Sequence, residues 1–600
     1  MATERQSVSK KNCWDVEAMY PTLADWGKEY ELNINSTAPR WPEIAKFKGR
    51  LAESPETLKQ AMDLILTTDR KLSRLYTYSH LRHDENLTHD EHTIAYGKMM
   101  SILNDFQEEI SWVEPELLAI PDPQMKTLLQ SPQLAEYRFH LEKIIRIKPH
   151  VLPLEQEELL AIAGKALQTP PKIFSALNDA DFKFGTVFDS QGEAKELTIG
   201  SYGVYQRDQD RTLRQNAFMK LHGKYAEYEN TFSELLQGQM QAHWFNARAR
   251  HYPSCLDAAL FPKNIDTAVY HALITAVHEQ IHVLHKYMAL RKKCLKGIDQ
   301  LHLYDMYVPL TSQCDVEIPY EEAEELVIES VAPLGKEYQS ILRDGLKNQR
   351  WVDRFENQNK RSGAYSSGCY DSAPYILMNY KDILRDVFTL AHEAGHSMHS
   401  YYSKKQPYQY SDYPIFLAEV ASTFNEELLT QLLIARAKSK DEKIYLITQK
   451  IDDIRTTLFR QTMFAEFELM IHQKVEQNIP FTPKQLREEF RKLNEFYFGS
   501  SVVIDQEAAI EWARIPHFYY NFYVYQYATG ISAALALVDR VVNGGKPELE
   551  GYLSFLKGGS SIYPIEMLQK AGVDMRSPEP VKAAIRRFDK LVDQLDQLTR

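Results

Sequence analysis

Glycine, proline and cysteine are scarce in this 600-residue chain, and each shortage argues against a class of fold or site. The 24 glycines and 27 prolines fall below the usual combined share of about 12%, which argues against a turn-rich β architecture and favours long helices. The five cysteines are widely scattered and include no C-x-x-C pair. Neither a disulfide framework nor a thiolate zinc site is therefore expected.

Long apolar runs and an excess of basic charge are also missing. The apolar stretch GISAALALV is about half a membrane span, and the N-terminal MATERQSVSKKNCW has no apolar core for a signal peptide. The formal net charge of −12 argues against a nucleic-acid partner, because phosphate binding needs a dominant basic face. We expect a cytoplasmic protein, with a monomer favoured and with neither a nucleic-acid nor a membrane partner.

Helical periodicity dominates the residues that are present. Apolar residues recur three and four apart from residue 14 to about 177, as in PETLKQAMDLILTTDRKLSRLYTYSHLRH, and again beyond 206. Two β-favouring runs within 182–205 flank a glycine-containing turn and predict a hairpin. We place a boundary there, between an N-terminal helical region at 1–195 and a second region at 196–600.

Two further segments favour extended structure. LHLYDMYVPL, at 301–310, alternates in hydrophobicity, and PYILMNY, at 374–380, is apolar but too short and too close to Pro374 for a helix. We expect the second segment to form a single strand directly before the most informative motif of the chain.

That motif is HEAGH, in DVFTLAHEAGHSMHSYY at 386–402. On a helix, His392 and His396 project from one face about 6 Å apart along the axis, so both imidazoles can reach one zinc ion. Glu393, beside the first histidine, can then take a proton from water. The pattern predicts a catalytic zinc site that needs a third protein ligand and one open position.

Glu419 is the best candidate for the third ligand. It lies in FLAEVASTFNE among apolar neighbours, where an unpartnered buried carboxylate costs several kcal/mol. Glu426 falls on the same helix face and is the reserve candidate. His399 lies about 10.5 Å along the axis from His392, too far to share the metal, so we expect it to support a ligand or pack in the core.

A second H-E-x-x-H copy competes with the first. His278, Glu279 and His282 have the same spacing, and the residue at the matching interval downstream is Asp305, in the extended LHLYDMYVPL stretch. Their own helical pattern continues into the basic KYMALRKKCLK. An exposed amphipathic helix explains this copy more simply than a metal site does.

A segment near the C-terminus is unusually rich in phenols. If ARIPHFYYNFYVYQYATG, at 513–530, is helical from Pro516 onward, His517, Tyr520, Tyr523 and Tyr527 share one face. That face could direct O–H and N–H donors at a developing oxyanion, whereas ordinary aromatic core packing is the alternative.

Several of these motifs together resemble those of oligoendopeptidase F, of the thimet oligopeptidase family of zinc metallopeptidases. The motifs are YILMNYKDILRDVFTLAHEAGHSMHS, FLAEVASTFNE, IPHFYYNFYVYQYATG and YDMYVPL, and the resemblance covers about 115–590. It implies one zinc ion on His392, His396 and Glu419, with Glu393 as general base. It also implies a mainly α-helical metallopeptidase with a deep substrate channel, a small β element beside the H-E-x-x-H helix, and a catalytic region at 196–600.

The resemblance carries further expectations about the reaction. His517 and Tyr527 are expected to stabilise the oxyanion and Tyr520 and Tyr523 to bind substrate, although the choice among the three tyrosines stays open. PYILMNY is expected to present its backbone to an extended peptide. The resulting hypothesis is an endopeptidase that cuts short unfolded oligopeptides. A helical zinc carboxypeptidase and a non-enzymatic peptide-binding scaffold are the alternatives.

Overall fold

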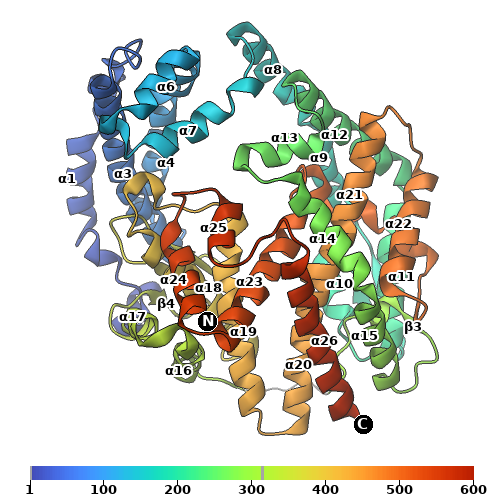
Figure 1. Ribbon diagram of the computed structural model, residues 1–600. Helices are drawn as coiled ribbons and strands as arrows, with labels where there is room; N and C mark the ends of the chain where they lie inside the picture. The colour runs from blue at the N-terminus through green and yellow to red at the C-terminus, as the bar shows by residue number, and fades with distance from the viewer. Residues whose placement is uncertain (1–2, 312–316) are drawn as a thin grey trace. The chain divides into compact units, whose positions relative to one another are not determined.

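The computed structural model describes residues 3–311 and 317–600, and helices dominate it, as Figure 1 shows. The strands among these residues are only two or three residues long. The mainly α fold class is therefore confirmed. In the part of the chain that the structure describes, no helix is both long and apolar enough to span a membrane.

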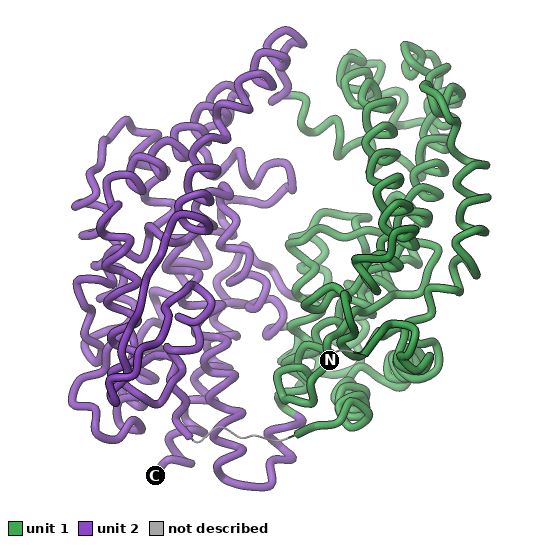
Figure 2. Tube along the Cα trace, turned by 180° about the vertical axis from the view of Figure 1, so that it is seen from behind, with its two compact units in different colours: residues 1–148, 315–431, 537–572 green, residues 149–314, 432–536, 573–600 purple. Residues whose placement is uncertain are grey.

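The chain folds into two compact units, coloured separately in Figure 2. Unit 1 comprises residues 1–148, 315–431 and 537–572, and unit 2 comprises residues 149–314, 432–536 and 573–600. Each unit is thus assembled from three separate stretches of sequence. None of the boundaries between these stretches falls at 195. The division into an N-terminal region at 1–195 and a catalytic region at 196–600 therefore stays a prediction.

Unit 1 contains two long amphipathic helices near its N-terminus, α3 and α4. Helix α3 starts where Ser54 accepts a hydrogen bond from the Thr57 backbone N–H and Pro55 occupies the first helical turn, two features that favour a helix start. It packs against α4 through a shared apolar core. The main helices of this unit are α3 (Pro55–Glu85), α4 (Asp90–Ile110), α6 (Asp122–Gln130), α7 (Arg138–Arg146), α16 (Tyr320–Ser330), α17 (Gly335–Lys347), α18 (Leu384–Ser403), α19 (Ile415–Arg436), α24 (Lys546–Gly558) and α25 (Pro564–Lys570).

A three-stranded sheet of unit 1 precedes α18. Its strands are β4 (Val352–Asp353), β5 (Tyr365–Ser367) and β6 (Tyr375–Leu377), and their order is β4-β6-β5. The predicted strand at 374–380 is confirmed as β6, but the role expected for it is wrong. Because β6 is paired with β4 on one side and with β5 on the other, its backbone is not available to a peptide. Among the described strands, β4 and β5 form the two edges of the sheet, and β5 is the edge strand beside α18.

Unit 2 contains the predicted hairpin and a second helical body. β1 (Thr186–Phe188) and β2 (Ala194–Glu196) pair antiparallel, which confirms the hairpin. β3 (Leu301–His302) pairs in parallel with β7 (Val502–Val503), but the chain then turns into a 3-10 segment, so 301–310 is extended only in part. The main helices are α8 (Leu154–Leu167), α10 (Ile199–Tyr205), α11 (Arg211–Ala226), α12 (Glu229–Ala249), α14 (Thr267–Glu279), α15 (Ile281–Cys294), α20 (Lys440–Ile454), α21 (Arg460–Glu476), α22 (Pro483–Phe498), α23 (Tyr525–Asn543) and α26 (Glu579–Thr599).

Candidate metal centre

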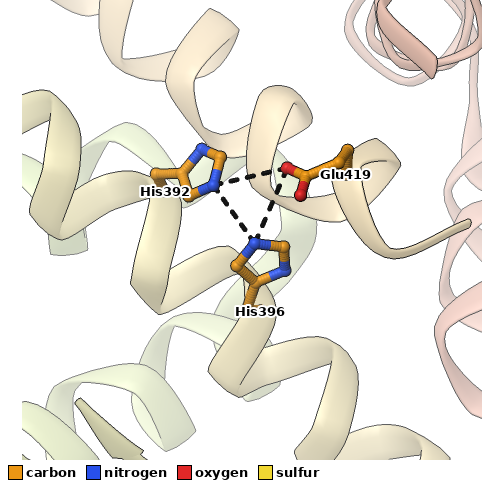
Figure 3. A group of neighbouring side chains, drawn as sticks. All are labelled: His392, His396 and Glu419. Carbon is orange, nitrogen blue, oxygen red and sulfur yellow. Dashed lines mark hydrogen bonds and ion pairs between the residues drawn. The ribbon is translucent and has the colours of Figure 1, made fainter. Parts of the chain in front are cut away.

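Helices α18 and α19 bring three ligand-type side chains together, as drawn in Figure 3. The Nε2 atoms of His392 and His396 are 3.1 Å apart. Oε2 of Glu419 lies 3.4 Å from Nε2 of His392 and 3.7 Å from Nε2 of His396. Ligand atoms at about 2.0–2.1 Å from a tetrahedral zinc ion are separated by about 3.4 Å, so this donor set fits zinc.

A glycine between the two histidines lets α18 and α19 approach each other closely. A Cβ atom built on Gly395 would lie 2.6 Å from Cα of Ser422 and 2.7 Å from the carbonyl oxygen of Ala421, both on the backbone of α19. The helix that carries Glu419 is therefore in direct backbone contact with the helix that carries the histidines. Sequence analysis did not single out Gly395, although a glycine in a helix interior, which costs about 1 kcal/mol relative to alanine, is a signal that could have indicated this close contact.

Hydrogen bonds orient all three ligand groups. Nδ1 of His392 is hydrogen-bonded to Oε1 of Glu426, which leaves Nε2 free to face the other ligands. The ring of His396 bonds to the backbone of Ala418. The Ser422 hydroxyl donates to Oε2 of Glu419 at 3.0 Å. The structure thus places Glu419, rather than the reserve candidate Glu426, beside both Nε2 atoms.

Glu419 lies where a third metal ligand is predicted, but burial was the wrong reason to select it. Its side chain is 50% exposed rather than enclosed by its apolar sequence neighbours, because those neighbours face the other side of α19. The carboxylate therefore remains hydrated on one side. This hydration leaves room for the open coordination position that a catalytic zinc ion requires.

The electrostatics of the site favour a cation between the rings. Burial alone would lower the pKa of His392, but the hydrogen bond and the charge of Glu426, with Glu393 and Glu419, raise it to about 9. Burial and then the charge of His392 lower the pKa of His396 to about 4. The carboxylates thus support one positive charge at this position, and a divalent metal ion would supply it.

Glu393 lies beside the metal ligands in a dry setting. It is 8% exposed, and burial raises its pKa, while the charge of His392 and a hydrogen bond from the backbone N–H of Ser366 act in the opposite direction. Ser366 belongs to β5, and its hydroxyl lies 2.8 Å from the hydroxyl of Ser397 on α18. Sequence analysis missed Ser366 because only the fold brings this strand to the helix.

The second H-E-x-x-H copy does not form a metal site. Helix α14 ends at Glu279 and α15 begins at Ile281, so the motif spans a helix break. His278 bonds to Glu466 at 2.7 Å, Glu279 forms an ion pair with a lysine of α26, and His282 is exposed. Two helices with ordinary surface pairs replace the one exposed helix that the sequence pattern predicts.

The other candidates near these motifs also have structural roles. Asp305 is fully buried and forms ion pairs with Arg211 at 3.0 Å and Arg214 at 2.8 Å. His399 is buried and stacks on the ring of Tyr413 with a centroid distance of 3.7 Å. Burial lowers the pKa of His399 to about 3, so the ring is neutral at physiological pH. His399 therefore packs in the core, one of the two roles expected for it.

The aromatic segment of unit 2 is not one helix, so the predicted common helical face is wrong. A 3-10 turn at Pro516–Tyr519 is followed by Asn521 and Phe522 with φ values of 43° and 56°, and α23 begins only at Tyr525. The backbone N–H of Phe522 donates to Oε1 of Glu468 at 2.7 Å. Glu468 is fully buried, and this burial raises its pKa to about 8 against the effect of that hydrogen bond.

Although the segment is not one helix, the four predicted side chains lie close together. The hydroxyl of Tyr527 and Nε2 of His517 are 3.2 Å apart, and the ring centroids of Tyr523 and Tyr527 are 5.5 Å apart. Tyr520 packs beside His517 with a centroid distance of 5.8 Å and is 57% exposed. Burial lowers the pKa of His517, so its ring is neutral near pH 7.

Comparison with known proteins identifies the family. The model of peptidase family M3 matches residues 204–587, and a model described as oligopeptidase F matches residues 116–184. The chain belongs to peptidase family M3. It is therefore an enzyme of the zinc metalloendopeptidase class, and the resemblance to oligoendopeptidase F is confirmed.

M3 relatives match nearly the whole chain. Oligopeptidase PepF of Bacillus subtilis is 41% identical over 597 residues, which cover 99% of this chain and 88% of the relative. An oligoendopeptidase F homolog of Lactococcus lactis is 37% identical over 600 residues, 100% of this chain and 99% of the relative. A solved structure from Chlamydophila abortus matches with a TM-score of 0.96 and 40% identity over 100% of both chains. Oligoendopeptidase-F from Enterococcus faecium matches with a TM-score of 0.71 and 34% identity over 97% of this chain and 99% of that one.

Proposed function

We propose that this M3 peptidase hydrolyses internal bonds of short, unfolded oligopeptides at a single zinc ion held by His392, His396 and Glu419. The observation that carries the proposal is the convergence of three ligand atoms at separations of 3.1, 3.4 and 3.7 Å beside a buried glutamate. Zinc in such a site would lower the pKa of a coordinated water and polarise the scissile carbonyl.

Glu393 acts as the general base in this proposal. Its carboxylate takes a proton from the attacking water and then passes the proton to the leaving amine. The backbone N–H of Ser366 holds the carboxylate in position, and Glu426 fixes the ring of His392 so that Nε2 faces the metal. These roles use only side chains and backbone groups of unit 1.

Donors for the oxyanion come from the aromatic segment at 513–530 in this proposal. We assign the role to His517 and the Tyr527 hydroxyl, and we assign substrate binding to Tyr520 and Tyr523. The support is that a neutral imidazole and three phenols are grouped around the turn at Asn521 and Phe522. Removal of one such donor typically lowers turnover by about 10²–10³-fold, so a Tyr527→Phe variant tests the assignment.

An extended peptide would pair with β5, not with β6. The N–H of Ile376 donates to the carbonyl of Trp351, the residue before β4, so the backbone groups of its neighbours Tyr375 and Leu377 face β5. Ser366 lies opposite Ile376 in the ladder of β5 and β6. Because backbone groups alternate in direction along the ladder, the carbonyl of Ser366 points away from β6, toward the outer edge of the sheet. This carbonyl is next to the N–H that holds Glu393, so a paired peptide would lie alongside the general base.

The proposal is tested with an internally quenched peptide of roughly ten residues, blocked at both ends, because strand pairing needs neither free terminus. We expect internal cleavage of this peptide, detected by mass spectrometry, and resistance of a stably folded protein incubated in parallel. Products limited to the C-terminal trimming of unblocked peptides would favour the carboxypeptidase alternative. Rapid cleavage within the folded protein would contradict the deep substrate channel.

A further inference from the structure

A cavity of about 440 Å³ lies within unit 2, and none of its lining residues holds the metal or has a role in the proposed reaction. Its walls come from α10, α11, α21, α22 and the 3-10 segment Gln506–Arg514, all in unit 2. Ile199 and Arg207 line the cavity and are exposed, so the cavity reaches the protein surface beside α10. Helix α10 is labelled in Figure 1. A volume of this size accommodates an organic molecule rather than a single ion.

The charge of the lining is predominantly positive. Arg207, Arg455, Arg460 and Arg514 contribute guanidinium groups, and Glu511 is the carboxylate of the lining. Arg460 and Arg514 both pair with Oε1 of Glu511, Arg514 at 2.8 Å. Burial acts to raise the pKa of Glu511, but the two arginines hold the pKa at about 2. This carboxylate is therefore ionised, and both arginines already bind it.

Of the other two arginines of the lining, Arg207 is exposed, whereas Arg455 is buried. Arg455 pairs at 3.0 Å with Asp452, which does not line the cavity, and it donates to the carbonyl of Met306. Its guanidinium carbon lies 4.9 Å from the centroid of the Tyr307 ring, a cavity wall. Burial acts to raise the pKa of Tyr307, yet Arg460 and Arg455 lower it below its usual range. A buried phenol titrates in this direction only where the local potential is positive.

Two polar groups near this charge lack hydrogen-bond partners. Nε of Arg514 is a buried donor without an acceptor, and Oδ1 of Asn494 is a buried acceptor without a donor. Nδ2 of Asn494 donates to the Phe490 carbonyl at 2.8 Å, which fixes the orientation of the amide. Asn494 is 1% exposed and lines the cavity. Buried groups of this kind usually find a partner. Neither atom has accessible surface, so a ligand with an anionic and an N–H group would supply a partner for each once the neighbouring side chains shift.

The rest of the lining is aromatic and aliphatic, with Tyr202, Phe218, Tyr225 and Phe498 among its residues. We infer that this cavity binds a small organic carboxylate that has an apolar body and an N–H donor, such as an N-acylated amino acid or a short peptide. The carboxylate pairs with the arginines, the apolar body packs on the rings, and the N–H group meets Asn494. A carboxylate suits the planar guanidinium group, and Glu511 already accepts one hydrogen bond from each of Arg460 and Arg514 through Oε1.

The test measures binding of N-acetyl-L-phenylalanine to the full chain by calorimetry and by thermal unfolding. The neutral amide of the same compound tests for the carboxylate, and acetate tests for the apolar body. We expect N-acetyl-L-phenylalanine to raise the unfolding midpoint by at least about 2 °C at saturation, and the two controls to have little effect. An Arg460→Met variant should bind about 10- to 100-fold more weakly, since it loses a charge-assisted hydrogen bond.

Two glycines of α10 provide a matched pair of variants. Gly203 lines the cavity, and a Cβ atom there meets only an Arg207 nitrogen at 3.9 Å, so Gly203→Leu fills the cavity without a backbone clash. Gly200 is exposed on the same helix and does not line the cavity, so Gly200→Leu is the control. We expect Gly203→Leu to abolish binding and Gly200→Leu to retain it. Binding that survives in Gly203→Leu, equal binding of the amide or of acetate, or no binding by the wild type would each overturn the inference.

Discussion

The substitution Gly395→Ala should damage the metal centre without touching a ligand. The added Cβ atom would lie 2.6 Å from Cα of Ser422, 2.7 Å from the carbonyl oxygen of Ala421 and 3.0 Å from its carbonyl carbon. Carbon atoms in proteins pack at about 3.5–4.0 Å, and all three neighbours are backbone atoms that cannot rotate away. Helices α18 and α19 must therefore separate locally by about 0.8 Å or more.

This separation acts directly on the ligand distances. His392 and His396 lie on α18 and Glu419 on α19, so the present separations of 3.4 and 3.7 Å between carboxylate and imidazole would both increase. Metal sites tolerate errors of about 0.2 Å in ligand distance. We expect zinc affinity to fall by about 10- to 100-fold, the loss that removal of a supporting contact typically causes. The metal-free protein should lose about 1–3 kcal/mol through overpacking, less about 1 kcal/mol gained from the helix propensity of alanine.

Competition with a chelating dye gives the zinc affinity, and thermal unfolding of the metal-free protein gives its stability. Gly97→Ala is the control, because Gly97 lies in the middle of α4 in the same unit and a Cβ atom there meets nothing within 4 Å. It should leave zinc affinity unchanged and stabilise the protein by up to about 1 kcal/mol. Zinc affinity of Gly395→Ala equal to that of the wild type would refute the argument that this contact sets the ligand geometry.

Three other substitutions test the remaining assignments. His396→Ala should abolish zinc retention measured by metal analysis while His282→Ala retains it, because α14 and α15 are separate helices; the opposite result would reverse the assignment. Glu393→Gln should retain zinc but lose nearly all peptide cleavage, because the amide cannot take a proton, and substantial remaining turnover would exclude the general-base role. Glu468→Gln should reduce the pH dependence of stability. With a pKa of about 8 in the folded protein, Glu468 keeps its proton over a range where the unfolded chain releases it, so wild-type stability should fall by roughly a few kcal/mol as the pH rises from about 4.5 to 8. Chemical denaturation across this range should give a flatter profile for Glu468→Gln, and an unchanged slope would contradict the assignment of that titration to Glu468.

The candidate metal ligands on α18 were predictable from sequence because helix geometry is local. Two histidines four residues apart must share a face of any helix that contains them, and α18 shows this with its Nε2 atoms 3.1 Å apart. The second copy has the same spacing but a helix boundary at Gln280, and spacing alone does not reveal that boundary. Glu419 was identified by its sequence neighbours, although its half-exposed side chain shows that burial was the wrong reason.

Long-range packing determines the parts of the site that the sequence did not reveal. Strand β6 was predicted from its own residues, but its place between β4 and β5 depends on segments around 352 and 366 that no local pattern links to it. The strand proposed to pair with a peptide is therefore β5, which contains Ser366, and Ser366 belongs to no sequence motif. In the aromatic segment, a helical spacing rule failed where the buried Glu468 accepts a hydrogen bond from Phe522 and supports a left-handed turn. The grouping of His517 with Tyr527 follows from that turn, so periodicity selected suitable side chains there but gave the wrong backbone path.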